Sequence, residues 1–254
     1  MFRPRIIPCL LLKDLGLVKS VRFKKYKYVG DPINAVKIFN EKIADELIFL
    51  DITATLEKRN VDIDLVRKIG EECNMPFSVG GGIRDIKTVR EILNAGAEKV
   101  IINSYAVENP DFIRDISDKF GVSTIVVSID AKKSLLGKYR IYTHNGKKFS
   151  AIHPVEHAMN MEKAGAGEIV INSIDKDGTL SGYDIELTRM VADSVNVPVI
   201  ALGGAGDYND FNIVVKEGGA SAAAAGSIFV FHGPMKGVLI SFPSNEKLVE
   251  LFSS

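Results

Sequence analysis

The feature that most constrains the fold is a regular alternation of short apolar runs with longer amphipathic segments along 254 residues. Each short run is expected to form a strand, and each longer segment a helix. The predicted strands cover residues 5–10, 46–52, 77–79, 99–103, 124–130, 168–173, 197–202 and 220–225. The predicted helices cover residues 32–42, 63–74, 86–95, 110–120, 154–164, 185–194, 209–217 and 245–252. Eight such units predict an α/β fold with a parallel sheet closed into a (β/α)8 TIM barrel.

An internal repeat supports two similar half-barrels. A glycine triplet at 80–82 follows the third predicted strand, and Gly-Gly-Ala-Gly at 203–206 follows the seventh. Asn103 and Ser104 end the fourth strand, and Gly226 and Ser227 follow the eighth. The offset is about half the chain. Because no linker separates the halves, residues 1–254 are expected to form one domain.

Composition narrows the classes of function. Basic and acidic residues both number 32, which gives no indication of a nucleic-acid or membrane partner. No apolar run is long enough for a transmembrane helix, and the first predicted strand begins too early for a signal peptide. The two cysteines, Cys9 and Cys73, form neither a disulfide framework nor a metal motif with the four histidines. We therefore expect a cytoplasmic protein with no metal and no cofactor.

Two connections are longer than the barrel needs. Residues 131–150 contain the run YRIYTH, which predicts a hairpin strand inserted after the fifth barrel strand. The connection at 13–31 has basic residues at Lys13, Lys19, Arg22, Lys24, Lys25 and Lys27 against one internal acid, Asp14. It is interpreted either as a mobile lid that attracts an anion or as a solvated basic loop.

The C-terminal ends of barrel strands build the active face. Glycines after the third and seventh strands allow a ligand to approach the backbone, so two phosphate sites on opposite sides are expected. The same glycines would also serve tight turns. Asp130 ends the fifth strand and is a candidate general acid or base.

The opposite face is expected to carry four charged side chains. Alternation along the strands points Arg5, Glu46, Lys99 and Glu168 into the N-terminal end of the barrel. Unpaired buried charge is costly, so a mutually paired ring is predicted. Such a ring is either a structural plug or a gate for a small molecule that enters along the axis.

Seven short motifs are spread over almost the whole chain. They are IIPCL at 6–10, FLDITA at 49–54, VGGGIR at 79–84, IN at 102–103, DKDGT at 175–179, GYD at 182–184 and GGAG at 203–206. Together they strongly resemble the cyclase subunit of imidazole glycerol phosphate synthase, the HisF family. The resemblance implies a barrel in a heterodimer with a glutaminase subunit at its N-terminal face. Ammonia would cross the barrel axis and meet a bisphosphorylated substrate at the C-terminal face.

The resemblance also implies roles for single residues. Arg5, Glu46, Lys99 and Glu168 match the ammonia gate. Gly82, Asn103 and Ser104 match one phosphate site, and Gly178, Gly204, Gly226 and Ser227 match the other. Lys19 and Asp130 match catalytic positions.

Three positions at the mouth depart from the family pattern. Leu11 stands where the family has an aspartate that works in general acid–base chemistry with the carboxylate matching Asp130. Leu202 replaces a serine, and Asn172 replaces a threonine. Leucine cannot move protons. The contribution of this general acid or base to the reaction rate, about 10²–10⁴-fold, is therefore expected to be lost.

A side branch of the family resembles the chain more closely, in CLLLKD at 9–14, ALGG at 201–204 and VLISFPS at 238–244. That branch is associated with amidation of an acetamido sugar of a surface polysaccharide to an acetamidino sugar, beside a glutaminase and a sugar amidotransferase. This function is our first hypothesis. The second is an authentic histidine-pathway cyclase in which Asp14 or Asp51 replaces the missing acid. The third is a non-catalytic scaffold that activates the glutaminase.

Overall fold

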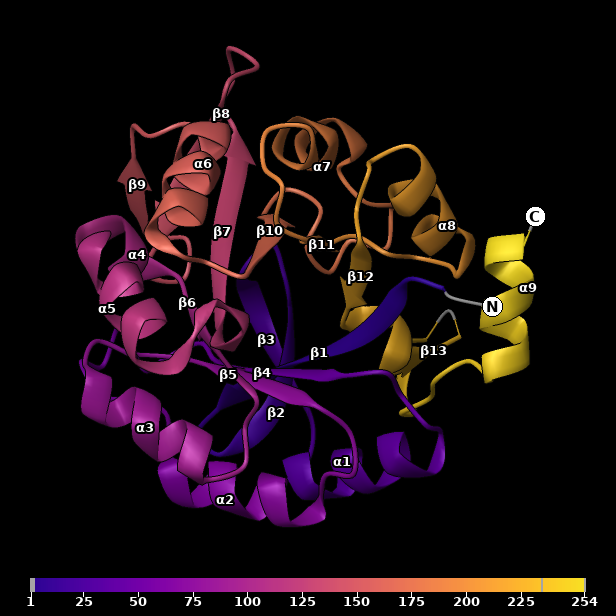
Figure 1. Cartoon of the computed structure of the whole chain (residues 1–254). Helices are drawn as coiled ribbons and strands as arrows, with labels where there is room; N and C mark the ends of the chain where they lie inside the picture. Colours follow the sequence, from indigo (N-terminus) through magenta and orange to yellow (C-terminus); the bar gives the residue numbers. More distant parts are fainter. Residues whose placement is uncertain (1–2, 234, 254) are drawn as a thin grey trace.

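Eight parallel strands close into a barrel in the computed structural model, which describes residues 3–233 and 235–253. The barrel strands are β1 (Arg5–Lys13), β4 (Leu47–Asp51), β5 (Phe77–Gly80), β6 (Lys99–Ile102), β7 (Ile125–Lys133), β10 (Glu168–Ser173), β11 (Val199–Leu202) and β12 (Ala222–Ala225). They pair in chain order, and the pairing of β12 with β1 completes the circle. The predicted (β/α)8 barrel is therefore confirmed (Figure 1).

Helices surround the strands in a ring (Figure 1). They are α1 (Pro32–Glu41), α2 (Ile63–Glu72), α3 (Ile86–Asn94), α4 (Ser104–Glu108), α5 (Asp111–Phe120), α6 (Pro154–Ala164), α7 (Ile185–Ala192), α8 (Asn209–Lys216) and α9 (Asn245–Ser253). Asp31 caps α1 by accepting a hydrogen bond from the Asn34 amide, as its position before proline favours. The short helix α4 was not predicted, because five residues are too few for a periodic signal.

The apolar core has two layers separated by the barrel wall. Ile6, Leu10 and Leu12 of β1 pack outward against the helices. Ile7 and Cys9 point inward, where they pack with residues from the other strands, and Leu11 packs against the same inner cluster. This alternation is the predicted one, and it places Leu11 inside the mouth of the barrel.

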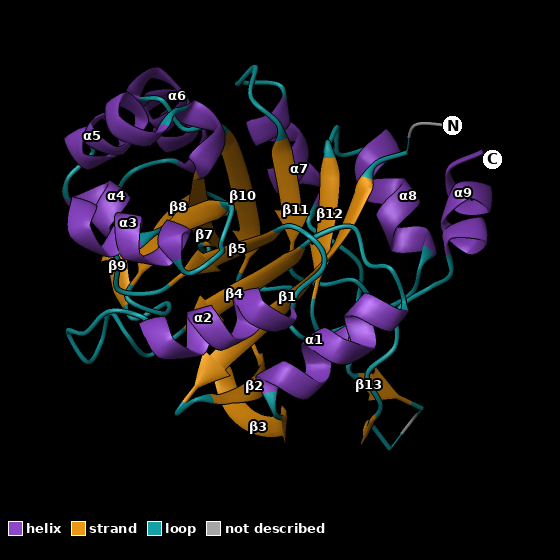
Figure 2. Cartoon of the chain, turned by 60° about the horizontal axis from the view of Figure 1, so that its bottom comes forward, coloured by secondary structure: helices purple, strands orange, loops and turns teal. Residues whose placement is uncertain are grey.

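The predicted loop at 13–31 is instead a β-hairpin, which corrects the expectation. β2 (Gly16–Val21) pairs antiparallel with the end of β1, and β3 (Lys24–Gly30) pairs with β2. Figure 2 shows both strands extending beyond the barrel strands, away from the two termini. A lid at this position would therefore be an ordered hairpin, not a long loop.

Two further hairpins decorate the barrel. The predicted insertion after β7 is confirmed as β8 (Tyr139–Thr143), which pairs with β7, followed by β9 (Lys148–Ser150). A small hairpin of β13 (Phe231–His232) and β14 (Gly237–Val238) was not predicted. Within the described residues, each helix is too short or too polar to cross a bilayer.

Candidate functional site

Four charged side chains form a closed ring at the N-terminal end of the barrel. Arg5 donates to Glu46 and, at 2.8 Å, to Oε1 of Glu168. Lys99 Nζ lies 3.1 Å from Oε2 of Glu168 and 3.3 Å from Oε1 of Glu46. Ser78 adds a 2.9 Å hydrogen bond to Glu46. The alternating charges cancel, so the ring is paired in the way that the strand pattern predicts.

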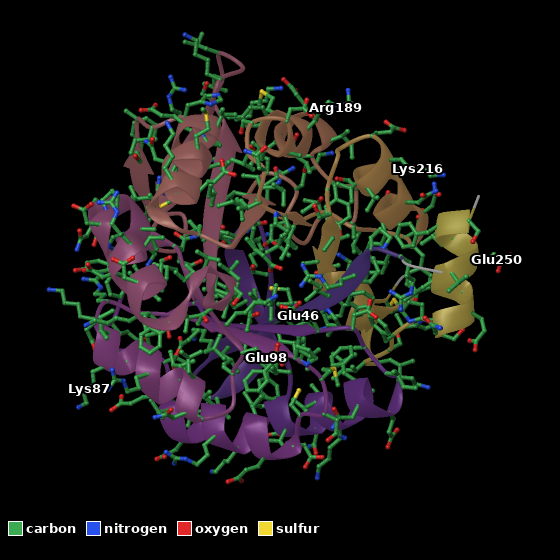
Figure 3. The ribbon with its side chains drawn as sticks, in the orientation of Figure 1. Glu46, Lys87, Glu98, Arg189, Lys216 and Glu250 are labelled. Atoms are coloured by element: carbon green, nitrogen blue, oxygen red, sulfur yellow. The ribbon has the colours of Figure 1, made fainter. Side chains whose placement is uncertain are left out.

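The ring lies across the barrel axis, and Glu46 appears near the middle of the strands in Figure 3. The Glu46 side chain is only 3% exposed. Burial alone would lower the pKa of Arg5, but Glu168 and Glu46 together raise it above its ordinary value. This geometry suits a structural plug and a gate equally, and the gate stays a prediction.

One pocket opens at the C-terminal end of the barrel. It brings together every candidate residue that was predicted for this face. These are Leu11, Lys19, Gly82, Asn103, Ser104, Asp130, Gly178, Gly204, Gly226 and Ser227. The residues come from β1, β2, β7 and the loops that follow the other strands, so closure of the barrel is what assembles them.

Asp130 is the best-placed acid in this pocket. Asn172 donates to its Oδ1 at 2.8 Å, and Asn103 donates to its Oδ2 at 2.9 Å. Burial raises the pKa of Asp130 to about 6, although both amides favour the ionised form. A carboxyl with this pKa exchanges protons near neutral pH.

Lys19 reaches into the pocket from β2 and is buried. Its ammonium donates to the Cys9 carbonyl at 2.5 Å, and burial lowers its pKa. Burial raises the pKa of the Cys9 thiol to about 12, so this cysteine stays protonated as a core residue. The ordered hairpin is what holds Lys19 at the mouth.

From the sequence, Asp177 was placed only within the DKDGT motif at 175–179 and was given no role of its own. Asp177 lines the pocket beside Lys19 and accepts a 3.4 Å hydrogen bond from Ser20. Burial raises its pKa to about 6, opposed by the charge of Lys19. The available signal was its place in the loop that follows β10, where polar residues reach the active face.

An apolar wall lines the pocket together with these polar side chains. Leu11 and Leu50 pack against the inner cluster to which Leu202 and Ile101 belong, and all four line the pocket. Two of them, Leu11 and Leu202, are the positions at which the family resemblance implies polar side chains. The lining of the mouth is therefore mixed, with apolar side chains next to polar ones.

Three of the four glycines of the expected phosphate sites, Gly82, Gly178 and Gly204, are required by backbone packing. A Cβ on Gly82 would lie 2.0 Å from the Arg59 carbonyl, and one on Gly178 would lie 2.0 Å from the Ser20 carbonyl. Gly204 has a φ of 117° and a similar clash. Ser104 already accepts a hydrogen bond from the His144 amide at 2.9 Å. The turns thus explain these three glycines without a ligand, and the phosphate role stays a prediction.

Within residues 3–233 and 235–253, no group of three or more His, Cys, Asp and Glu side chains is arranged to hold a metal ion.

Comparison with known proteins decides the family. A model described as "Histidine biosynthesis protein" matches residues 5–235. A Pseudomonas aeruginosa protein provisionally named imidazole glycerol phosphate synthase subunit hisF2 is 48% identical over 98% of this chain and 99% of its own length. The chain belongs to the HisF family. The resemblance drawn from the seven motifs is confirmed.

Two further HisF relatives extend over the same length. A Vibrio vulnificus protein, provisionally named subunit hisF3, is 45% identical over 99% of this chain and 98% of its own length. A Leptospira interrogans protein, provisionally named subunit HisF, is 44% identical over 99% of this chain and its full length. Similarity to HisF therefore covers the barrel and both of its faces.

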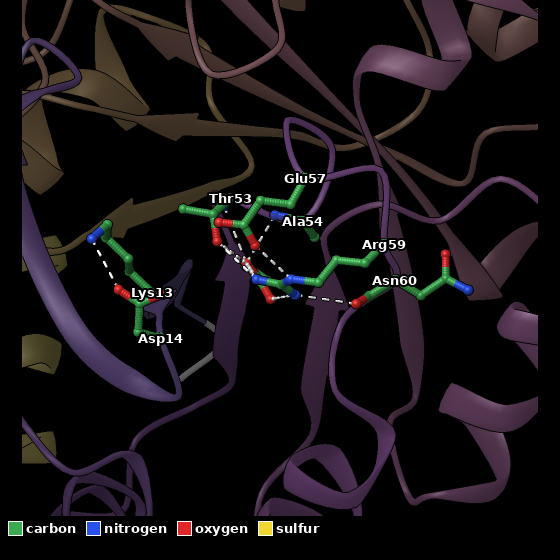
Figure 4. Close-up of polar contacts among 8 residues, drawn as sticks. Lys13, Asp14, Thr53, Ala54, Glu57, Arg59 and Asn60 are labelled. Atoms are coloured by element: carbon green, nitrogen blue, oxygen red, sulfur yellow. Dashed lines mark hydrogen bonds and ion pairs between the residues drawn. The ribbon is translucent and has the colours of Figure 1, made fainter.

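Neither proposed substitute for the acid missing from this HisF barrel is free to act (Figure 4). Asp14 is 73% exposed, pairs with Lys13 and does not line the pocket. Asp51 lines the pocket but is held by Arg59 at 2.5 Å and by the amides of Thr53 and Ala54. The Asp51 carboxylate is thus already engaged by Arg59 and by the loop that follows β4.

Proposed function

We propose that this HisF barrel receives ammonia from a glutaminase subunit and passes it on for amidation of a surface-polysaccharide sugar. In that reaction ammonia replaces the oxygen of an acetamido group, giving an acetamidino group and water. The proposal depends on the combination of two features. The charged ring at the N-terminal end of the barrel is complete, whereas position 11 at the C-terminal end is a leucine.

The barrel interior suits neutral ammonia. Between the ring and the mouth lies the inner apolar cluster, which includes Ile48, Val126, Val170 and Ile200. An ammonium ion would lose its hydration there without a partner, whereas neutral ammonia carries no such penalty. In this proposal Arg5 or Lys99 moves aside to admit ammonia to the interior.

The proposed partner of the N-terminal face is a HisH-like glutaminase in a heterodimer. The relatives' names as synthase subunits support an assembly of this kind. A sugar amidotransferase at the C-terminal face would take the ammonia. The protein would work in the cytoplasm, where glutamine is available.

The second candidate is an authentic cyclase of histidine biosynthesis. Lys19, Asp130 and Asp177 remain together in the pocket, and two carboxyls there have a pKa of about 6. This arrangement favours the second candidate. The location of Asp14 outside the pocket and the pairing of Asp51 with Arg59 argue against it. A non-catalytic scaffold is the third candidate, for which the mouth would bind no phosphorylated ligand.

The deciding experiment reconstitutes the barrel with its glutaminase. We expect glutamine to be hydrolysed while the bisphosphorylated histidine-pathway substrate is left unchanged. Addition of the sugar amidotransferase and an acetamido sugar should then give the acetamidino product, detected by mass spectrometry as loss of one oxygen and gain of one NH. Formation of imidazole glycerol phosphate at an ordinary enzymatic rate would contradict the proposal.

A further inference from the structure

A second concave surface lies on the outer side of the β2–β3 turn, beside the barrel mouth. Four cationic side chains line it: Arg22, Lys24 and Lys25 from the turn, and Lys132 from β7. Val21 and Ile174 provide an apolar floor. We call these residues, together with Asp175, the outer groove.

The single acid of the outer groove is already engaged. Asp175 Oδ2 accepts a 2.8 Å hydrogen bond from the Lys133 amide, and its backbone carbonyl accepts a 3.0 Å bond from Arg22 Nε. The hydrogen bond from Nε to the Asp175 carbonyl orients the Arg22 guanidinium. In the part of the chain that the structure describes, Lys24 and Lys25 form no ion pair. The outer groove therefore holds four cationic side chains against the single carboxylate of Asp175, an excess of positive charge.

The turn that presents these cations has an unfavourable backbone. Val21 pairs with Lys24, so Arg22 and Phe23 form a two-residue hairpin turn with φ values of 52° and 59°. Such a turn prefers Asn-Gly, because side chains with a Cβ disfavour positive φ. Lys25 also has a positive φ, of 55°. Large side chains at strained positions indicate that the side chains themselves are used.

The turn separates the two concave surfaces. Phe23 lines the barrel mouth and lies against Gly146, whereas Arg22 lines the outer groove. Tyr26 accepts a 2.8 Å hydrogen bond from Asn145, which ties the hairpin across the mouth. An anion bound between the turn and Lys132 would tie the same hairpin to β7 from the other side.

We propose that the outer groove is an anion site, separate from the barrel mouth, for a diphosphate group such as that of a nucleoside diphosphate sugar. A diphosphate carries several negative oxygens, which match three ammonium groups and one guanidinium better than a single phosphate does. The apolar floor suits the face of a base or sugar. The site rests on its own charges and geometry, so it is tested independently of ammonia transfer.

Lysine footprinting of the full chain tests the site. Acetylation of each lysine by an N-hydroxysuccinimide ester is followed by mass spectrometry, with and without uridine diphosphate or inorganic pyrophosphate. We expect each probe to slow labelling of Lys24, Lys25 and Lys132 by about threefold or more and to leave Lys87 unchanged. Protection should fall as salt rises, because the groove is exposed.

Matched variants complete the test. Replacing Lys24 and Lys25 together by alanine should abolish protection of Lys132 and weaken probe binding in calorimetry about tenfold. The control replaces Lys68 and Lys87, two exposed helix lysines, and should bind like the wild type. Equal labelling rates with and without both probes, or protection of Lys19 alone, would overturn the proposal. Either result would leave the proposed ammonia transfer untouched.

Discussion

The two ends of the barrel differ in how their buried charged groups are paired. At the N-terminal end Arg5, Glu46, Lys99 and Glu168 pair completely, and their charges cancel within the ring. At the C-terminal end Asp130 is surrounded by amides and is raised in pKa to about 6. The N-terminal ring therefore has all of its charges paired, whereas the C-terminal pocket contains a carboxyl group that can titrate near neutral pH.

The departures from the family resemblance lie at the C-terminal end of this HisF barrel. The N-terminal ring lacks none of its four expected members, and the mouth keeps Lys19 and Asp130. The departures at positions 11 and 202 build an apolar wall at the mouth alone. In the proposed function, the barrel would keep the ring needed for ammonia entry and would lack one acid at the place where ring closure would occur.

The largest expected effect comes from reversing a charge in the ring. Lys99→Glu would leave three acids beside one arginine, so we expect the free energy of unfolding to fall by about 3–5 kcal/mol. Urea unfolding measures the loss, and Lys87→Glu on the exposed face of α3 is the control. In the complex, Lys99→Met should also reduce transfer of ammonia. Unchanged stability of Lys99→Glu and unchanged ammonia transfer by Lys99→Met would contradict both roles of the ring.

A smaller loss is expected from a glycine of the mouth. Gly82→Ala puts a Cβ against the Arg59 carbonyl at a φ of 70°, so we expect a loss of about 2–4 kcal/mol. Gly121→Ala is a matched control, because Gly121 has a φ of 88° but open space around its Cβ. The difference between the two variants in urea isolates the clash. Equal losses would show that the turn at Gly82 has room for a side chain.

The smallest effect concerns pH. The folded pKa of Asp130, about 6, lies above that of an unfolded aspartate, so the folded protein binds this proton more tightly. The contribution of Asp130 to the free energy of unfolding should therefore rise by roughly 1–3 kcal/mol as pH falls from about 7 to about 4. Urea unfolding of wild type and Asp130→Asn across this range should show the difference, with Asp118→Asn as the surface control. Parallel profiles for wild type and Asp130→Asn would contradict the raised pKa.

The sequence predicts the barrel well because its signals are local. Alternating apolar runs place the strands, and period two fixes which residues of β1 face inward. The β2–β3 hairpin was missed because Arg22 and Phe23 occupy a turn that usually carries Asn-Gly. Asp177 was missed because its burial arises from the hairpin that packs over it, a contact between distant parts of the chain. Pairing in the charged ring followed from strand alternation together with the cost of unpaired buried charge.

The most direct test of the central claim is the cyclase activity of wild type, Leu11→Asp and Leu11→Asn with ammonia and the bisphosphorylated substrate. Asparagine matches aspartate in size but moves no proton at this position, so it separates acid–base chemistry from polarity. We expect no turnover by wild type or Leu11→Asn, and measurable turnover by Leu11→Asp. This result would show that the old site is intact apart from its acid. Substantial turnover by the wild type would contradict the account, because Leu11 would then be compatible with the family reaction.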